Sequence, residues 1–334
     1  MARIVRNLNE RAVRSRNVVL AAGFFDGVHR GHCSVIRRAL SLAKARGAET
    51  WVLTFDVHPR RVLNPEEAPS ILTSSDHKVA LLSEMGVDGC IVLRFTARLA
   101  RQSPEAFVAR LAAAVPGLSG VVVGENWRFG RGRRGTPGLL SKLGRRHGFD
   151  LTLAPPATWR GDEVSSTRIR NAVAAGKLGE ARRMLGRPFS ILGTVIPGRR
   201  IGRTLGLPTA NLDPHNEVRP PKGVYVALAR MSLGWYWGVV NLGIRPTFSP
   251  RGQRTPSLEL HMPGITQNLY GRNVEVFFMA RLRAERTFPG LDALKSQVGR
   301  DIERARAWLR LEAASGRLKR KMFFGALQGT VNPI

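Results

Sequence analysis

Between residues 18 and 126 the chain alternates short apolar runs with longer stretches of helical periodicity, and this alternation is the feature that most limits its fold. Runs that are apolar at every position fit strands buried on both faces, so the pattern predicts a parallel sheet with helical crossovers, a doubly wound α/β unit. The predicted strands and helices, in chain order, are VVLAAGF (18–24), CSVIRRALSLAKARG (33–47), TWVLTFD (50–56), SSDHKVALLSEMG (74–86), CIVLRF (90–95), PEAFVARLAAAV (104–115) and GVVVGEN (120–126).

Two polar segments follow predicted strands directly: GFFDGVHRGH (23–32) and VGENWRFG (123–130). In open α/β sheets, ligands bind beyond the carboxyl ends of the strands. We therefore expect one site to contain both segments.

The pattern changes near residues 186–197 to strands without intervening helices, separated by Gly and Pro turns. This spacing predicts an antiparallel barrel or sandwich, closed by a final helix at about residues 291–311. We accordingly predict three parts: an α/β domain (1–185), a β domain (186–312) and a basic tail (313–334) without period, to which we assign no function.

The chain has 334 residues, 43% hydrophobic and 23% charged, which is enough for two folded domains and too apolar for a disordered protein. Its net charge of +29 makes a cationic nucleic-acid-binding protein the main rival to an enzyme. The arginines are dispersed, however, and no RNA-binding or zinc-finger pattern occurs. We expect small anionic substrates instead of nucleic acid, and oligomerisation stays open.

No apolar run reaches the roughly 18 residues of a membrane-spanning helix. The Arg-rich start followed by VVLAAGFF imitates a signal peptide, but its apolar part is short and ends in Asp26 and His29. The two cysteines, Cys33 and Cys90, have no metal-binding or disulfide spacing. We expect a cytoplasmic protein.

The segment GFFDGVHRGH carries the clearest chemistry. A helix opening near Gly31 presents backbone N–H groups to an anion, and the two imidazoles of His29 and His32 can donate hydrogen bonds to phosphate oxygens. A zinc pair or two structural histidines are the alternatives, although HxxH with Cys33 is not a standard zinc set.

Two further segments suit phosphate. SSTRIR places hydroxyl residues (Ser165, Ser166, Thr167) at a predicted helix start, where a plain N-cap with a solvated Arg168 is the alternative. The loop WRFGRGRRG contains four arginines whose guanidinium groups could bind phosphate oxygens: Arg128, Arg131, Arg133 and Arg134. The alternative is a solvated loop without a ligand.

The β half has its own cluster, PGRRIGRTLGLPTANL (197–212). Gly202 and Gly206 fit a phosphate-covering loop without P-loop spacing, and Thr209 and Asn211 offer oxygen ligands for Mg²⁺ or form a simple turn. Glu259 stands between Leu258 and Leu260 on a predicted strand; we expect its carboxylate to face inward as a base, or as a structural acceptor.

The whole decapeptide is similar to the HxGH signature of nucleotidylyltransferases, and it most resembles the bacterial riboflavin kinase/FMN adenylyltransferases, also called FAD synthetases. The order TFDVHPRRVLNP, ILTSSDHK, VVVGENWRFGRGRRG, VSSTRIR, GLPTANL, KGVYVALA, VVNLGIRPTF, SLELH and LRAERTF fits that family over about residues 18–312. The resemblance implies a nucleotidylyltransferase domain followed by a riboflavin kinase barrel.

The resemblance also implies roles. His29 and His32 stabilise the transferring phosphate, with Arg168 holding phosphates, and Glu259 accepts the proton of the riboflavin 5′-hydroxyl. Thr209 and Asn211 position Mg²⁺. The nucleotide-binding residues so implied are Gly23, Phe25, Asp26, Gly31, Asn126, Ser165, Ser166, Thr167, Arg168, Gly202, Gly206 and Thr209.

The resemblance predicts two ATP-dependent reactions, riboflavin to FMN and FMN to FAD with release of pyrophosphate. A member with one activity is the alternative, because the sequence departs from the family pattern at three positions. Val57 replaces a proline, Trp127 a phenylalanine and Asn268 an aspartate. We expect changed packing at the first two and doubt any charge-dependent contact at the third.

Overall fold

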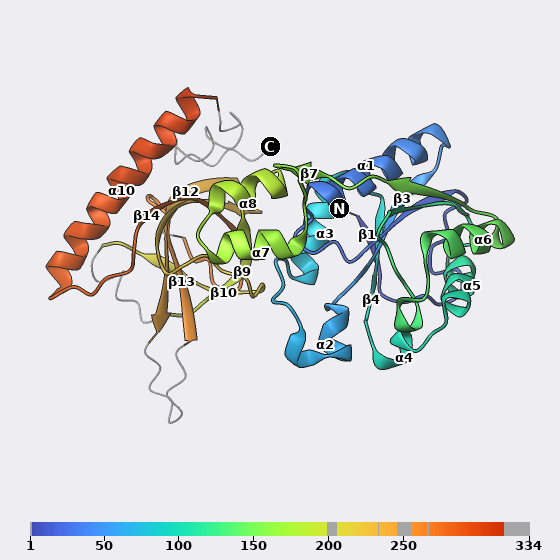
Figure 1. Ribbon diagram of the computed structural model, residues 1–334. Helices are drawn as coiled ribbons and strands as arrows, with labels where there is room; N and C mark the ends of the chain where they lie inside the picture. Colours follow the sequence, from blue (N-terminus) through green and yellow to red (C-terminus); the bar gives the residue numbers. More distant parts are fainter. Residues whose placement is uncertain (1, 199–205, 233, 246–254, 266, 317–334) are drawn as a thin grey trace. The chain divides into compact units, whose positions relative to one another are not determined.

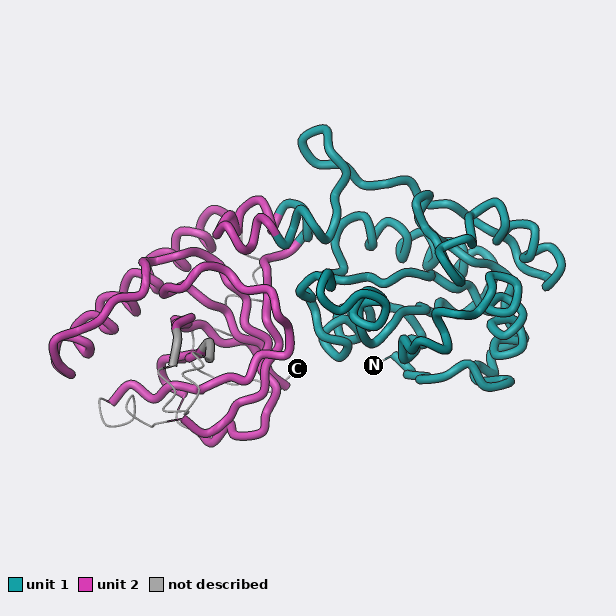
Figure 2. Tube along the Cα trace, turned by 60° about the horizontal axis from the view of Figure 1, so that its bottom comes forward, with its two compact units in different colours: residues 1–170, 183–186 teal, residues 171–182, 187–334 magenta. Residues whose placement is uncertain are grey.

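The computed structural model describes residues 2–198, 206–232, 234–245, 255–265 and 267–316 (Figure 1). The chain forms two compact units, coloured separately in Figure 2. Unit 1 comprises residues up to Arg170 together with Arg183–Gly186, and unit 2 comprises Asn171–Arg182 and the described residues from Arg187 onward. No helix within these described ranges is long and apolar enough to cross a membrane.

Unit 1 contains a six-stranded sheet in which every pair of neighbours is parallel. Its strands, in the order in which they lie side by side, are β1 (Arg3–Val5), β4 (Gly89–Leu93), β3 (Glu49–Phe55), β2 (Val18–Ala22), β5 (Leu118–Gly124) and β6 (Asp150–Ala154). The chain order reverses between β2 and β5. This topological switch point is where doubly wound sheets bind ligands.

Helices cover both faces of this sheet. Odd and even residues of β2 belong to different cores, because successive strand residues point to opposite faces. Val19 and Ala21 pack with α1 (Arg30–Ala45) and α3 (Ser75–Glu84). Val18 and Leu20 pack with the helices of the other face, α5 (Pro104–Ala114) and α6 (Pro137–His147). The predicted α/β sheet is confirmed.

The first strand was not predicted. β1 lies in the Arg-rich start and pairs with β4 from Arg3↔Gly89 to Val5↔Ile91. Its three residues are too few for a periodic signal, so pairing with a neighbouring strand, and not local sequence, makes this segment a strand.

Short elements connect the larger ones in unit 1 and lead into unit 2. They are α2 (Pro59–Leu63), η1 (Pro65–Glu67), α4 (Ala97–Ala100), η2 (Arg131–Arg133), β7 (Thr158–Trp159), β8 (Asp162–Glu163), α7 (Ser166–Ala174) and α8 (Leu178–Leu185).

Unit 2 is a closed antiparallel barrel, which decides between the barrel and the sandwich. Its strands, in spatial order, are β10 (Thr209–Pro214), β13 (Thr255–His261), β12 (Gly234–Arg245), β11 (Gly223–Met231), β14 (Asn273–Arg283) and β9 (Ser190–Ile196). The final helix α10 (Leu291–Ala314), red in Figure 1, lies along the outside of the barrel.

The outer face of the barrel is identified by what packs against α10. Trp237 and Val239 of β12 belong to one apolar cluster with Ile302 and Leu309 of α10. Asn241 follows Val239 by two residues on the same strand and therefore lies on the same outer face. The same alternation can be used to assign other polar residues of the barrel strands to the inner or the outer face.

Candidate functional site

The segment GFFDGVHRGH connects β2 to α1. The helix begins at Arg30, with His29 as its N-cap: the His29 Nδ1 atom accepts a hydrogen bond from the His32 backbone N–H at 3.4 Å. Glycine at 31 leaves room for this cap, because a Cβ atom there would lie 3.2 Å from the His29 ring. The predicted strand-to-helix turn is confirmed, and free N–H groups of a helix start attract anions.

The two imidazoles lie together at this turn. The His29 and His32 rings stack, with centroids 3.5 Å apart and planes 21° apart, and the Phe25 ring meets His32 edge-on at 5.3 Å. His29 is 5% exposed. Among the described residues, no three His, Cys, Asp or Glu side chains are grouped to hold a metal ion.

The turn itself has strained backbone. Phe25 and Val28 have φ angles of 54° and 39°, a region that costs a residue with a side chain about 1–3 kcal/mol, and Gly27 has a φ of 81°. Such a conformation persists only where surrounding contacts hold it. The strained backbone of the turn therefore indicates a role in positioning side chains such as His29 and His32, in addition to any role in stability.

Asp26 supplies much of this support. Its carboxylate is 1% exposed and accepts hydrogen bonds from the backbone N–H groups of Leu72 and Thr73, both at 3.0 Å. Arg170 forms an ion pair with it at 2.6 Å. Asp26 thus ties the turn to the segment before α3, and it does not line the adjacent cavity.

Arg170→Met is expected to lower the free energy of unfolding by about 3 kcal/mol, because it leaves a buried carboxylate without its cation. Urea denaturation followed by circular dichroism measures this change. Arg145→Met, at an exposed position on α6, is the matched control. A loss no larger than that of the control would contradict the supporting role of the pair.

A cavity of about 330 Å³ opens beside the two histidines. Its walls come from the ends of β2, β5 and β6 and from the start of α7, so it lies at the switch point of the sheet. It brings together eight of the predicted site residues: Gly23, Phe25, His29, Gly31, His32, Asn126, Ser165 and Ser166. Ligand cavities of this size are common in enzymes.

The SSTRIR segment starts α7 as expected. Ser165 Oγ accepts a hydrogen bond from the Arg168 backbone N–H at 3.3 Å, and Ser166 Oγ donates to the Asp26 carbonyl at 2.9 Å. Thr167 and Arg168 do not line the cavity. The Arg168 guanidinium instead donates to the Glu163 carbonyl at 2.7 Å and faces Asp162, on the β7–β8 hairpin.

Glu163 was not predicted as a site residue. It lines the cavity and accepts a hydrogen bond from the Asn126 amide at 3.5 Å. No motif points to this residue, because its place is set by the β7–β8 hairpin, whose two strands have two residues each.

The arginine loop is exposed at all four positions (128, 131, 133 and 134). Beside it, Trp127 lines the cavity and stacks on Phe129, with ring centroids 4.6 Å apart. Val57, at the other departure, has a backbone N–H that donates to Asp56 Oδ1 at 2.7 Å, a contact that proline cannot make.

In unit 2, three polar residues lie in one row across neighbouring strands. Glu259 of β13 is paired in register with Asn211 of β10 and with Asn241 of β12. Directly opposed residues of antiparallel strands point to the same face, so the three side chains are neighbours.

This row corrects one expectation, that the Glu259 carboxylate faces inward. Leu258 and Leu260 are fully buried on one face, whereas half-buried Glu259 shares the outer face with Asn241. Alternation along the strand sends neighbouring side chains to opposite faces, so a carboxylate flanked by two core leucines must point away from the core.

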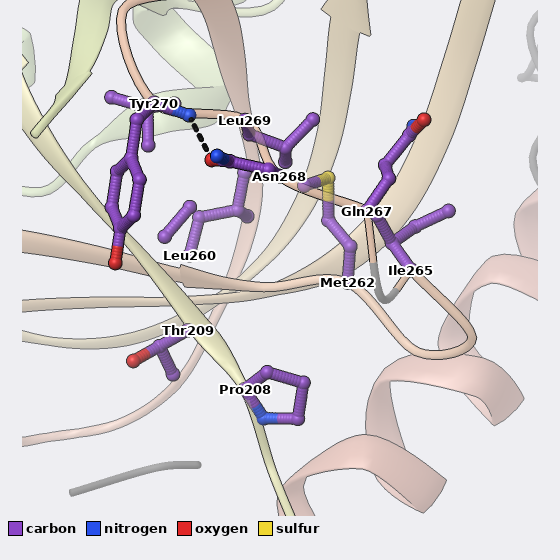
Figure 3. A pocket seen from close by; sticks show the side chains of 11 residues that line it. Pro208, Thr209, Leu260, Met262, Ile265, Gln267, Asn268, Leu269 and Tyr270 are labelled. Carbon is purple, nitrogen blue, oxygen red and sulfur yellow. Dashed lines mark hydrogen bonds between the residues drawn. The ribbon is translucent and has the colours of Figure 1, made fainter. Parts of the chain in front are cut away.

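A second cavity, of about 360 Å³, lies next to this row. Figure 3 shows its lining, which includes Thr209 at the start of β10 and Tyr270 of the segment before β14. Asn211 and Glu259 do not line it. Asn268 does, and its Oδ1 atom accepts a hydrogen bond from the Tyr270 backbone N–H at 3.0 Å. The amide oxygen of Asn268 can therefore accept this hydrogen bond in the turn as an aspartate would, but without a negative charge.

The glycine-rich loop is described only at its ends. Gly202 lies outside the described residues, and Gly206 is exposed, with a φ of 73°. At the other end, Gly198 lies against Asn211: a Cβ atom there would overlap the Asn211 amide. The loop thus begins over the Asn211–Glu259 row.

Two family models match the chain: FAD synthetase over residues 12–168 and riboflavin kinase over residues 185–309. They cover the α/β sheet and the barrel respectively. The crystal structure of a Streptococcus pneumoniae protein described as a macrolide-efflux protein has a TM-score of 0.77 and 28% identity, covering 91% of this chain and 98% of the other.

Curated relatives match along nearly the whole chain. The bifunctional riboflavin kinase/FMN adenylyltransferase of Escherichia coli strain K12 is 36% identical over 93% of this chain and 98% of the relative. The protein of the same description from Pseudomonas fluorescens is 37% identical over 91% of this chain and 97% of the relative. With both domain models and both cavities present, the chain belongs to the family of bifunctional riboflavin kinase/FMN adenylyltransferases.

Proposed function

We propose that the His29–His32 cavity of unit 1 carries out adenylyl transfer to FMN and that the Glu259 row of unit 2 carries out phosphorylation of riboflavin. The protein is a transferase of flavin biosynthesis, acting through both reactions. The observation that supports the first site most is the stacked imidazole pair at the start of α1, facing a cavity that Ser165 and Ser166 also line. We assign these activities to residues 1–185 and 186–312, and none to 313–334.

In the first reaction, a phosphate oxygen of FMN attacks the α-phosphorus of ATP, and the bond to the bridging oxygen of pyrophosphate breaks. Negative charge grows on the non-bridging oxygens as phosphorus becomes five-coordinate. Imidazole N–H groups of His29 and His32, with the N–H groups at the start of α1, would donate hydrogen bonds to these oxygens. Nothing covalent forms with the protein, so positioning provides the catalysis.

Asn126 and Ser166, which line the same cavity, would orient the substrates. Arg168 and Thr167 do not line it, and for Arg168 to hold a phosphate its guanidinium must leave the carbonyls of Glu163 and Trp159 and the carboxylate of Asp162. The pair with Asp162 is exposed and therefore weak, so a bidentate bond to phosphate would favour this exchange once the nucleotide is bound.

In the second reaction, the 5′-hydroxyl oxygen of riboflavin attacks the γ-phosphorus of ATP, and ADP leaves. Glu259 would accept the hydroxyl proton, because it is half-buried and shares its row with the oxygen- and nitrogen-bearing side chains of Asn211 and Asn241. The 360 Å³ cavity lined by Thr209 would hold the nucleotide.

The oxygen atoms that the second site offers are of the kinds that Mg²⁺ prefers as ligands. Thr209 and Asn211 stand two residues apart on β10 and therefore share a face with Glu259, which gives a hydroxyl, an amide oxygen and a carboxylate. Mg²⁺ takes few protein oxygens and completes its shell with phosphates and water. When bound, it would neutralise phosphate charge.

We also place the protein in the cytoplasm, a proposal that its low cysteine content, two in 334 residues, supports.

Incubation of the protein with riboflavin and Mg-ATP is expected to yield FMN first and FAD second, with ADP and pyrophosphate as by-products. Chromatography of the flavins measures both steps at once. Supplying FMN in place of riboflavin should give FAD directly. If no FAD appears from FMN, the assignment of the unit 1 cavity is wrong; if no FMN appears from riboflavin, the assignment of unit 2 is wrong.

A further inference from the structure

Lys78 is a fully buried cation in unit 1. It belongs to α3 and is 1% exposed. Its Nζ atom donates hydrogen bonds to the Phe24 carbonyl at 2.9 Å, the Phe55 carbonyl at 2.8 Å and the Thr54 hydroxyl at 3.2 Å. All three acceptors lie at the carboxyl ends of β2 and β3, so one ammonium group joins the ends of adjacent strands.

The Phe24 carbonyl is held twice. Besides Lys78, the Thr54 hydroxyl donates to it at 2.9 Å. This carbonyl belongs to the peptide bond that precedes Phe25, the residue with a φ of 54°. The ammonium therefore acts on the peptide group where the strained turn begins, four residues before the N-cap His29.

Lys78 also contacts the wall of the cavity without reaching the cavity. Its Nζ lies 4.3 Å from the centre of the Phe24 ring, and that ring lines the cavity. The His58 ring meets the Phe24 ring edge-on, with ring centroids 4.8 Å apart. Lys78 is not among the lining residues, so it is placed to orient the site and not to touch a substrate.

A purely structural role does not explain a charge at this place. Removing an ammonium from water is costly, and an apolar side chain of similar volume is often as stabilising in a protein interior. What the ammonium provides and an apolar side chain does not is three directed hydrogen bonds that hold carbonyl groups in fixed positions.

We propose that Lys78 is a positioning residue for adenylyl transfer: its ammonium holds the Phe24 carbonyl, and through it the strained turn that presents His29 and His32 to the nucleotide. This inference rests on the assignment of the unit 1 cavity to that reaction.

The charge state of Lys78 gives the proposal a distinct pH signature. Burial lowers its pKa from 10.5 to about 8, against the opposing effects of Asp26, Asp56 and Cys90. Burial raises the pKa of Cys90 to about 12, and the pKa of His58 is lowered by burial and by nearby cations, including Lys78. Lys78 is thus the group in this cluster that loses its proton above pH 8.

Stability and activity then respond to pH in opposite directions. The folded-state pKa lies below the unfolded value, so between pH 8 and pH 10.5 the unfolded chain holds more protons, and the contribution of Lys78 to stability rises with pH. Over the same range the positioning charge is lost. If Lys78 had only a structural role, its deprotonation would slow catalysis only by making the protein less stable. Slower catalysis at unchanged or higher stability therefore indicates a positioning role.

The first test uses the unmodified protein. The kcat for FAD formation from FMN and Mg-ATP is expected to fall roughly tenfold between pH 7.5 and pH 9.5, where both substrates are already fully ionised. Riboflavin phosphorylation by the same chain is the internal reference, and the urea midpoint at each pH monitors folding. A kcat for FAD formation that stays level across this range overturns the proposal.

The second test compares two substitutions. Lys78→Met is expected to lower kcat for FAD formation by about 100-fold, with the KM for ATP little changed, because displaced catalytic groups affect the transition state most. Lys78→Arg keeps the charge at every pH and should restore activity and remove the alkaline fall. Lys142→Met, at an exposed lysine of α6, is the control. FAD formation by Lys78→Met equal to that of the control overturns the proposal.

His32→Ala separates failure of this inference from failure of the assignment on which it rests. If His32→Ala still forms FAD at the parental rate, the cavity is not the adenylyl site. Suppose instead that His32→Ala is inactive, that Lys78→Met forms FAD as fast as Lys142→Met, and that kcat stays level up to pH 9.5. Then the cavity is the adenylyl site and only the proposed role of Lys78 is wrong.

Discussion

Replacing His32 with alanine is expected to lower the rate of FAD formation by about 100- to 1000-fold and to leave riboflavin phosphorylation within about twofold of the parent. The imidazole lines the cavity and stacks on the ring of His29, with ring centroids 3.5 Å apart. Its removal takes away a donor aimed at the place where charge develops in the transition state. The measurement is the separate rate of each reaction, started from FMN and from riboflavin.

His147→Ala is the control for this substitution, because His147 is exposed in the last turn of α6. Equal losses from the two variants would mean that His32 has no special part in the reaction. Loss of both activities in a folded His32→Ala protein would contradict the assignment of one reaction to each unit.

Replacing Glu259 with glutamine is expected to slow riboflavin phosphorylation by about 100- to 10,000-fold, while FAD should still form at the parental rate when FMN is supplied. Glutamine keeps the size and the outer-face position of the side chain but accepts no proton. Because the strand pairing of Asn211, Glu259 and Asn241 stays intact, the loss should appear in kcat.

The control for Glu259 is Glu303→Gln, an exposed carboxylate on α10 that pairs with Arg306 at 3.2 Å. It should leave both reactions unchanged, because an exposed pair of this kind contributes little. If Glu259→Gln phosphorylates riboflavin as fast as this control does, another group takes the proton and the outer-face row is not the kinase site.

Much of the fold could be predicted because its pattern is local. The run Val18–Ala22 is apolar at every position, which required burial on both faces, and α1 and α5 supply that burial. β1 could not be predicted, since its three residues become a strand only by pairing with β4. The choice between barrel and sandwich likewise depends on closure between β9 and β10, which no single segment encodes.

The candidate site divides in the same way. His29 and His32 are three residues apart at a helix start, so the sequence alone predicts that they lie together. Asp26 stands in the same motif, yet its carboxylate is engaged by amides 46 and 47 residues away and by Arg170. A motif shows which residues are close along the chain and not which way each side chain points.

The amino-acid sequence by itself therefore determined the two fold classes and the strand-to-helix turn with its paired imidazoles, because these follow from periodicity and short-range order. It also indicated the family, through the resemblance of its motifs. Only the tertiary structure decided that Asp26 supports the turn, that Glu259 faces outward beside Asn211, and that Lys78 joins the ends of β2 and β3. Those roles depend on hydrogen bonds between segments distant in the chain, and such contacts exist only after the strands and helices have packed.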